Sequence, residues 1–193
     1  MIKQRFRLIP FPAPDLPAVS LHGAFWLDHQ FLTLQYRLSG DLESVLLPPI
    51  SPNPKRKEEL WKATCFEFFL AIKDQPGYWE FNLSPSGDWN VYRMDAYRRI
   101  GFREEPTISQ LPFEFSKGSD EYCLDVSVDL GPIAGPGDEL DIAVTAIIQT
   151  KDGNETYWAL AHPAHQADFH AREGFILRLV GQTLPSAGSS PDG

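Results

Sequence analysis

Two glutamates and an asparagine have the types and spacing that suit binding of a polar molecule. Glu67 interrupts the apolar run 65–70, and Glu80 and Asn82 alternate with apolar residues in 78–83. Because successive side chains of a strand point to opposite faces, a hairpin of these segments would place all three on one face. Carboxylates and an amide there offer paired hydrogen bonds to vicinal hydroxyls, so we expect a polyol site.

Aromatic and basic residues nearby extend this expected ligand site. Trp89 and Tyr92 offer flat apolar platforms, and Arg93 offers a charged donor. A second interpretation stays open, in which the glutamates pair with Arg93 and Arg98 inside the fold and Trp89 fills the core. Four arginines lie in this part of the sequence: Arg93, Arg98, Arg99 and Arg103. They would suit recognition of a carboxylate or phosphate, and the alternative is that they are solvated surface charges.

Three of the five histidines lie close together in the C-terminal part, with Asp168 among them: His162, His165 and His170. Imidazoles with a carboxylate are ordinary zinc or iron ligands, but this spacing matches no standard metal motif. We therefore predict no metal site. We expect Asp168 and His170 to hydrogen-bond to the backbone or to the polar strand face, so both join the candidate ligand-binding residues.

Catalytic motifs are missing from the sequence. It contains no nucleophile elbow, phosphate-binding glycine loop, dinucleotide fingerprint or Cys-His catalytic signature. A paired-carboxylate hydrolase would use Glu67 and Glu80 as acid and base, but spacing along one chain does not fix their separation. We expect binding rather than catalysis, with a metal-dependent or glycosidic enzyme as an alternative.

The elements that must position these residues are predicted as β-strands. Strict alternation predicts strands at 31–38, 122–130 and 140–148, and apolar residues on both faces predict central strands at 64–72 and 174–180. Turn-forming residues separate the strands at hairpin spacing, and one short helix is predicted at 54–62. About ten strands without strand-helix-strand alternation predict an all-β, antiparallel two-sheet β-sandwich with at most one or two short helices.

Composition sets the limits of this prediction. The 193 residues carry 26 acidic and 17 basic side chains, a formal net charge of −9, so a broad phosphate-binding surface and a nucleic-acid partner are not expected. A 42% hydrophobic content is that of a globular chain. We expect one domain at 1–181 and a disordered tail at 182–193, where Pro, Ser and Gly dominate.

The compartment is predicted from the cysteines and from hydropathy. Residues 1–9 alternate charged and apolar side chains and lack the apolar core of a secretory signal, and no run reaches the roughly 18 apolar residues of a membrane helix. Cys65 and Cys123 lie in apolar strand-like runs, which favours free thiols. We expect a soluble, cytoplasmic protein without a membrane partner, in an oligomeric state that the sequence does not indicate.

Four segments carry a resemblance to a known family: 60–70, 78–93, 157–163 and 168–170. With these motifs, the chain resembles the DOMON-like proteins of bacteria, notably cyanobacteria, which are similar to family-nine carbohydrate-binding modules. The resemblance covers most of the chain, to about Val180. It implies a β-sandwich that binds a sugar or a haem in a pocket at one face.

The resemblance also implies particular residues for each ligand. Cytochrome members of the family ligate haem iron with a Met and a His, which here would be Met94 with His162 or His170. The sugar-binding modules clamp their ligand between aromatic rings, which here would be Trp89 with Tyr92 or Trp158. The favoured function is a non-catalytic module for a carbohydrate or related polar small molecule, with haem binding as the alternative; the sequence does not identify a cofactor.

Overall fold

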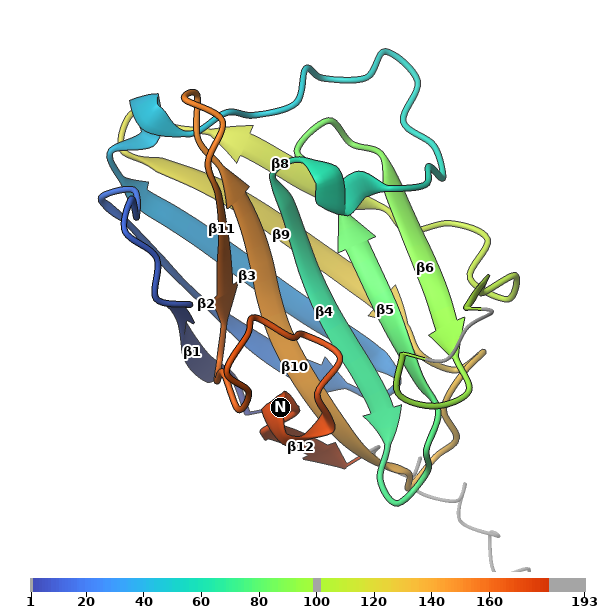
Figure 1. Ribbon diagram of the computed structural model, residues 1–193. Coiled ribbons are helices and arrows are strands. Elements are labelled where there is room, and N and C mark those ends of the chain that lie inside the picture. The colour runs from blue at the N-terminus through green and yellow to red at the C-terminus, as the bar shows by residue number, and fades with distance from the viewer. Residues whose placement is uncertain (1, 99–101, 181–193) are drawn as a thin grey trace, which may run out of the picture.

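The protein folds as a sandwich of two antiparallel β-sheets. Figure 1 shows its computed structural model, which describes residues 2–98 and 102–180. Within these residues every pair of named strands is antiparallel. The predicted all-β, two-sheet sandwich is therefore confirmed, whereas the tail predicted at 182–193 lies outside the described residues.

The two sheets share one strand. The front sheet has the order β7 (Arg103–Glu104), β6 (Trp89–Met94), β5 (Tyr78–Leu83), β4 (Cys65–Ile72), β10 (Glu139–Gln149) and β11 (Glu155–Ala159). The back sheet has the order β1 (Gln4–Pro10), β2 (Val19–Asp28), β3 (Phe31–Gly40), β9 (Glu121–Asp129) and β8 (Phe113–Lys117). The first half of β1 pairs with β2 and its last two residues pair with β11, which joins the layers along one side.

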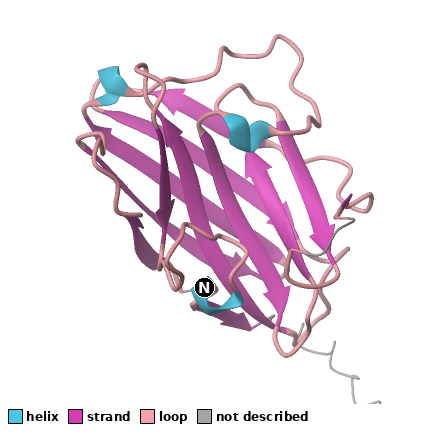
Figure 2. Ribbon diagram, in the orientation of Figure 1, coloured by secondary structure: helices cyan, strands magenta, loops and turns pink. Residues whose placement is uncertain are grey.

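Helical structure in the described residues is limited to three single turns of 3-10 helix: η1 (Leu42–Ser44), η2 (Leu60–Lys62) and η3 (Arg172–Gly174) (Figure 2). The helix predicted at 54–62 forms only in its last turn. Arg56 explains the difference, because its guanidinium donates to the backbone carbonyls of Val91, Glu105 and Ile108 and holds the preceding chain against β6. No helix in the described ranges is long and apolar enough to cross a membrane.

The last strand departs from the prediction of a central strand at 174–180. The strand β12 (Leu177–Val180) is short and pairs only with β10, next to the position that β11 occupies further along the same edge. Its residues alternate between exposed and buried, and Ile176 just before it is exposed. Phe175 is buried, but it packs on the outer face of the front sheet, so apolar residues on both sides here do not mark a central strand.

The main core lies between the two sheets. Phe68 of β4 and Phe81 of β5 stack there with ring centroids 4.2 Å apart and planes 10° from parallel. Tyr36 of β3 crosses the core and donates a hydrogen bond of 2.8 Å from its hydroxyl to the carbonyl oxygen of Glu67. This bond fixes the middle of β4 against the back sheet. Because Phe66 and Phe68 point into the main core, the side chain of Glu67 between them points to the outer face.

A second, smaller apolar cluster covers part of that outer face. It contains Phe69, Ala71, Tyr78, Tyr92, Met94, Ala143 and Phe175. Residues of β4 and β5 are therefore buried on both faces, which explains the nearly continuous apolar run at 64–72.

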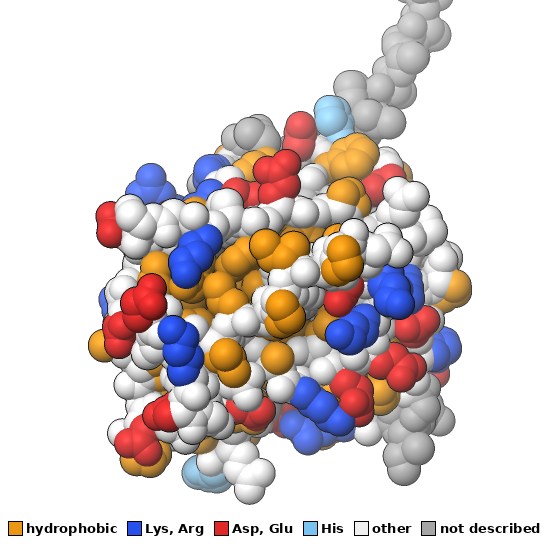
Figure 3. All heavy atoms as spheres, turned by 90° about the horizontal axis from the view of Figure 1, so that it is seen from above, with side chains coloured by type: hydrophobic (Ala, Val, Ile, Leu, Met, Phe, Trp, Pro, Cys, Tyr) orange, Lys and Arg blue, Asp and Glu red, His pale blue; other side chains and the backbone are white. Residues whose placement is uncertain are grey.

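Free thiols and mixed surface charge complete the fold. Cys65 is buried, Cys123 is half-buried, and both are free. Seen from the end of the sandwich at the top of Figure 1, apolar side chains gather in the middle of the view, and acidic and basic side chains surround them (Figure 3). The excess of acidic residues is thus spread among basic ones on this face.

Candidate functional site

Strand register brings the predicted polar residues to one surface. In the β4–β5 pair, Glu67 lies opposite Asn82 and Phe69 lies opposite Glu80. Because paired residues share a face, Glu67, Glu80 and Asn82 all point outward, away from the core between the sheets. In the β5–β6 pair, Tyr92 lies opposite Glu80 and shares this face.

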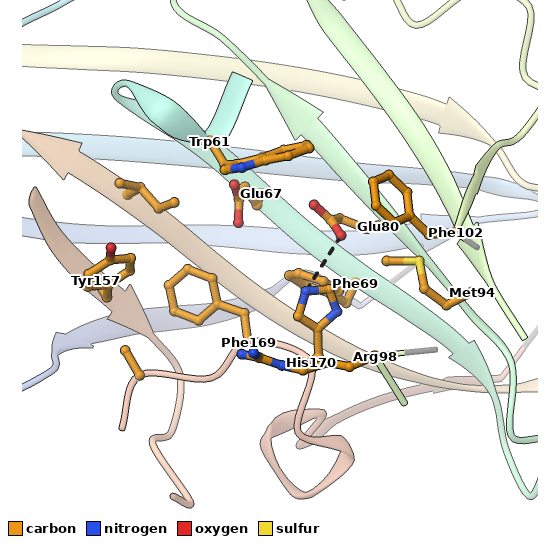
Figure 4. A pocket seen from close by; sticks show the side chains of 12 residues that line it. Trp61, Glu67, Phe69, Glu80, Met94, Arg98, Phe102, Tyr157, Phe169 and His170 are labelled. Carbon is orange, nitrogen blue, oxygen red and sulfur yellow. Dashed lines mark ion pairs between the residues drawn. The ribbon is translucent and has the colours of Figure 1, made fainter. Parts of the chain in front are cut away.

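The connection between β11 and β12 covers this surface. Both strands pair with the same side of β10, so the chain leaves that edge after Ala159 and returns to it at Leu177. Between these points the loop passes over the outer face (Figure 4). There it places the rings of Phe169 and His170 against Phe69, with centroids 6.5 Å and 5.3 Å away.

The loop is fastened at Asp168. One carboxylate oxygen of Asp168 accepts hydrogen bonds from Arg98 (2.9 Å and 3.3 Å) and from the backbone N–H of His170 (3.0 Å), and the other accepts one from the Tyr97 hydroxyl (2.5 Å). Burial would raise the pKa of Asp168, but the hydrogen bonds from Tyr97 and Arg98 outweigh it and lower that pKa. Asp168 is therefore a structural anchor for the loop and does not line the pocket described next.

A pocket of about 470 Å³ lies between the loop and the sheet. Its lining comes from β4, β5, β6, β10, β11, η2 and the loops around them: Trp61, Glu67, Phe69, Glu80, Met94, Arg98, Phe102, Ile147, Tyr157, Ala167, Phe169 and His170. In the view of Figure 4, the carboxyl groups of Glu67 and Glu80 point into the space between Trp61 on one side and Phe169 and His170 on the other. The pocket thus has an acidic floor and aromatic walls.

The two carboxyl groups of the floor are buried and poorly paired. Glu67 is 2% exposed, and its Oε2 receives a long contact of 3.5 Å from Thr145 Oγ1. The Cys65 thiol also interacts with this carboxyl group, but Oε1 has no partner within hydrogen-bond distance among the residues that the structure describes. Glu80 is 8% exposed, and its Oε1 accepts a hydrogen bond of 2.8 Å from Asn82 Nδ2.

Burial without cationic partners changes how both groups titrate. Burial raises the pKa of Glu80 to about 7. Burial, followed by repulsion from Glu80, raises the pKa of Glu67 well above its ordinary value. Near neutral pH the floor is therefore partly protonated, and its carboxyl groups can donate as well as accept hydrogen bonds.

His170 faces this floor as a neutral imidazole. Its Nδ1 lies 2.9 Å from the Tyr78 hydroxyl, which also accepts a 3.4 Å contact from the backbone N–H of Arg98. Its Nε2 lies 3.9 Å from Glu80 Oε2. Burial, reinforced by the charge of Arg98, lowers the pKa of His170 to about 4, so this contact is not an ion pair at neutral pH.

Other predicted site residues fall into two groups. Tyr92 is buried behind the pocket wall, where its ring packs against Trp61 and Phe102 with centroids 5.7 Å and 5.0 Å away. Asn82 lies at the floor and orients Glu80. Trp89 and Arg93 do not belong to this site.

The ligand-platform interpretation of Trp89 is corrected by strand register. Trp89 lies opposite Leu83, so it points into the main core, and the Arg56 guanidinium lies 4.4 Å from its ring centroid. Trp158 also points into the main core, where its Nε1 donates to Thr156 Oγ1. Neither tryptophan can clamp a ligand in this pocket.

The arginines do not form the predicted cluster. Arg93 is exposed, lies opposite Trp79, and covers that ring at 5.3 Å, on the side of β6 away from the pocket. Arg98 binds Asp168, and Arg103 binds Asp95 at 3.0 Å, so neither pairs with the buried glutamates. Arg99 lies outside the described residues.

The residues predicted for haem are only partly brought together. Met94 and His170 line the same pocket, whereas His162 lies elsewhere, with its Nε2 2.9 Å from the carbonyl oxygen of Ile9. The Nδ1 of His170 is engaged in a hydrogen bond with Tyr78, and its Nε2 faces Glu80 Oε2 at 3.9 Å. Iron ligation would have to break this arrangement and place a haem over a buried carboxyl group, so these residues fit a haem poorly.

The clustered histidines do not converge on a metal site. Among residues 2–98 and 102–180, no group of three or more His, Cys, Asp or Glu side chains is close enough to hold a metal ion.

Sequence reasoning missed most of the aromatic wall. Trp61, Phe102 and Phe169 stand in loops or in a single helical turn, where alternation gives no signal. Tyr157 was accessible to sequence reasoning, because it neighbours Trp158 on β11 and must point to the opposite face. The positive φ values of Glu59 (59°), next to η2, and of Arg98 (41°) mark two places where the backbone turns sharply beside the pocket.

Solved structures share this fold. A protein of Bacteroides uniformis, provisionally assigned as carbohydrate-binding, matches with a TM-score of 0.65 and 12% identity over 89% of this chain and 83% of its own. A family-nine carbohydrate-binding module of Caldicellulosiruptor kristjanssonii, solved with cellotriose, matches with a TM-score of 0.53 and 12% identity over 82% and 74%. No family model and no curated protein matches the sequence. The chain therefore has the fold of carbohydrate-binding modules.

Proposed function

We propose that this protein is a non-catalytic binding module whose outer-face pocket takes a carbohydrate or a related polar small molecule. The observation that carries the proposal is Glu67 Oε1, a buried polar atom without a partner among the described residues, on a side chain that lines the pocket. A buried acceptor without a partner costs about 1–3 kcal/mol. A ligand hydroxyl placed there would recover that free energy.

The rest of the pocket suits a sugar as well. Glu80 and Glu67 supply donors and acceptors for vicinal hydroxyls, while Trp61, Phe169 and Phe69 supply apolar surface for the C–H faces of a ring. The volume of about 470 Å³ is within the range of roughly 300–1,000 Å³ that small-molecule sites occupy. The shared fold with carbohydrate-binding modules supports this proposal. We extend the proposal to the DOMON-like assignment that the sequence motifs suggest.

Binding is favoured over glycoside hydrolysis by the placement of the two carboxyl groups. A glycosidase needs its two carboxyl groups on either side of the scissile bond. Glu67 and Glu80 are diagonal neighbours on adjacent strands and rise from the same floor. Both carboxyl groups would contact the same side of a ligand. This placement suits hydrogen bonding to the ligand and does not place an acid and a base on either side of a glycosidic bond.

A thermal-shift screen against neutral monosaccharides and disaccharides tests the proposal, because a ligand that binds only the folded state raises the melting temperature. We expect at least one sugar to raise it in the wild type and not in Trp61→Ala. The matched control is Trp26→Ala, which removes a half-buried tryptophan from β2 in the back sheet. The proposal fails if no sugar stabilises the protein, or if Trp61→Ala responds as strongly as the control.

A further inference from the structure

The acidic floor of the pocket has more acceptors than the protein supplies donors for. Three carboxyl oxygens have unused capacity: Glu67 Oε1 without a partner in the described residues, Glu67 Oε2 with one contact of 3.5 Å, and Glu80 Oε2 at 3.9 Å from His170 Nε2. All three belong to groups that line one pocket. A single ligand group with three donors would match them.

No cationic side chain in the described part of the chain balances this floor. The guanidinium of Arg98 lines the pocket, but it is bound to Asp168 at 2.9 Å and 3.3 Å. His170 is neutral near pH 7, because burial and the charge of Arg98 lower its pKa to about 4. Glu67 and Glu80 therefore repel each other across the floor, and a positive charge brought by a ligand would relieve that repulsion.

The walls also favour a cation. Trp61 and Phe102 lie on one side, with centroids 6.5 Å apart, and Phe69 and Phe169 lie on the other, also 6.5 Å apart. The face of an aromatic ring attracts an ammonium group, and the attraction is stronger when the cation is desolvated. Ring faces and carboxylates together attract an ammonium group more strongly than either does alone, whereas a neutral hydroxyl gains only the hydrogen bond.

We propose that the ligand of this pocket carries a protonated amine, and that the ammonium group sits on Glu67 and Glu80 between the aromatic walls. This inference rests on the proposed function, and it narrows the carbohydrate class to amino sugars. The three N–H donors of a primary ammonium match the three carboxyl oxygens that lack full hydrogen bonding. The sugar ring then lies above the floor, against Trp61 and Phe169.

The charge state of the floor depends on all the groups that surround it. Those on the sheet are Cys65 and Glu67 of β4, Tyr78 and Glu80 of β5, Tyr92 of β6 and Tyr157 of β11. Those in the loops are Glu58, Arg98, Asp168 and His170, and Glu104 lies on β7. Of the groups that touch the pocket, Glu80 titrates near neutral pH, with a pKa of about 7.

Isothermal titration of the full chain at pH 7 with glucosamine, glucose and N-acetylglucosamine tests the inference. Glucose lacks the amine, and N-acetylglucosamine keeps the nitrogen but carries no charge. We expect glucosamine to bind at least tenfold more tightly than either neutral sugar. Repeating the titration in buffers of different ionisation enthalpy should show protons released from the floor with glucosamine and none with the neutral sugars.

Methylammonium serves as a second probe, because it has three N–H donors and stays protonated from pH 6 to pH 7. Its affinity should rise roughly fivefold from pH 6 to pH 7, following the ionised fraction of a carboxyl group with a pKa of about 7. Glu67→Gln and Glu80→Gln keep the shape of the floor, and each should weaken glucosamine binding at least tenfold more than it weakens glucose binding. Glu114→Gln, an exposed site on β8 in the back sheet, is the matched control and should change neither.

The outcomes separate this inference from the proposed function. If glucose or N-acetylglucosamine binds as tightly as glucosamine and no proton is released, the amine inference is overturned while carbohydrate binding stands. If glucosamine and methylammonium both fail to bind, the inference is overturned whatever the neutral sugars do. If no sugar binds, neutral or charged, the proposed function is overturned as well.

Discussion

Glutamine in place of Glu80 should stabilise the free protein, and by an amount that depends on pH. In the folded state burial raises the pKa of Glu80 from its ordinary 4.5 to about 7. The folded state therefore holds this proton over a range where the unfolded chain has lost it. Stability then falls as pH rises from about 4.5 to about 7, because the folded state binds more protons in that range.

The size of the effect follows from the shift. Each unit of pKa difference corresponds to about 1.4 kcal/mol, so a shift of about 2.5 units costs roughly 3 kcal/mol of folding free energy at pH 8. Glutamine cannot ionise, and its Oε1 can still accept from Asn82 Nδ2. The difference in unfolding free energy between Glu80→Gln and the wild type should therefore grow by roughly 3 kcal/mol from pH 4.5 to pH 8. For a chain of this size, that corresponds to about 6–12 °C in melting temperature.

Urea denaturation of both proteins across this pH range measures the gain as a difference, which removes the contributions of groups that the two share. Glu114→Gln controls for the loss of one negative charge, since Glu114 is exposed on β8. A difference that stays constant with pH would refute the reasoning. So would a variant less stable than wild type at pH 8, since Glu80 would then be ionised and favourably paired in the folded state.

Three further substitutions test the supports of the pocket. Tyr78→Phe removes the partner of His170 Nδ1, and urea denaturation should show a loss of about 1–2 kcal/mol; an unchanged midpoint would contradict the hydrogen bond. Asp168→Asn releases Arg98 and should speed proteolysis within the β11–β12 loop at pH 7, so equal cleavage of the two proteins would argue against the anchor. Because the hydrogen bonds lower the pKa of Asp168, the greater protease resistance of the wild type should disappear as pH falls below that pKa. Phe81→Ala empties the stacked position in the main core and should cost about 3–5 kcal/mol in the same denaturation assay, whereas a loss under 1 kcal/mol would mean that the ring is not tightly packed.

Strand period accounts for what the sequence could predict of the site. Within one strand the face of every residue follows from alternation, so Glu80 and Asn82 could be assigned to one face of 78–83 without a structure. The hairpin with 65–72 then required only that a short turn join the two segments. The burial of Glu67 and Glu80 beside each other was therefore within reach of the sequence.

The side on which Trp89 points depends on the turn that precedes it. The β5–β6 turn is closed by a hydrogen bond from the Ser84 N–H to the Asp88 carbonyl, and Gly87 adopts φ 93° within it. This closure sets Leu83 opposite Trp89, and a shift of one residue would have turned Trp89 outward. Alternation within 89–94 gives relative faces only, so the sequence could not tell a core tryptophan from a ligand platform.

Tertiary packing determines the remaining part of the site. Trp61, Phe102 and Phe169 reach the pocket from three separate loops, and nothing local in these loops indicates a common destination. Their convergence depends on contacts between segments far apart in the sequence, as the ring contacts between Trp61 and Phe102 and between Phe69 and Phe169 show. Such contacts are the least accessible to pattern analysis.

Because β11 and β12 attach to the same side of β10, the loop between them can vary in sequence. The loop between them begins and ends on one strand, so its length and composition can change without altering the register of any strand pair. Exchanging this loop would alter the wall that carries Phe169 and His170 while leaving the acidic floor on β4 and β5 in place. The fold is thus suited to engineering, because the acidic residues of the sheet stay in place while the loop that shapes the pocket can be replaced.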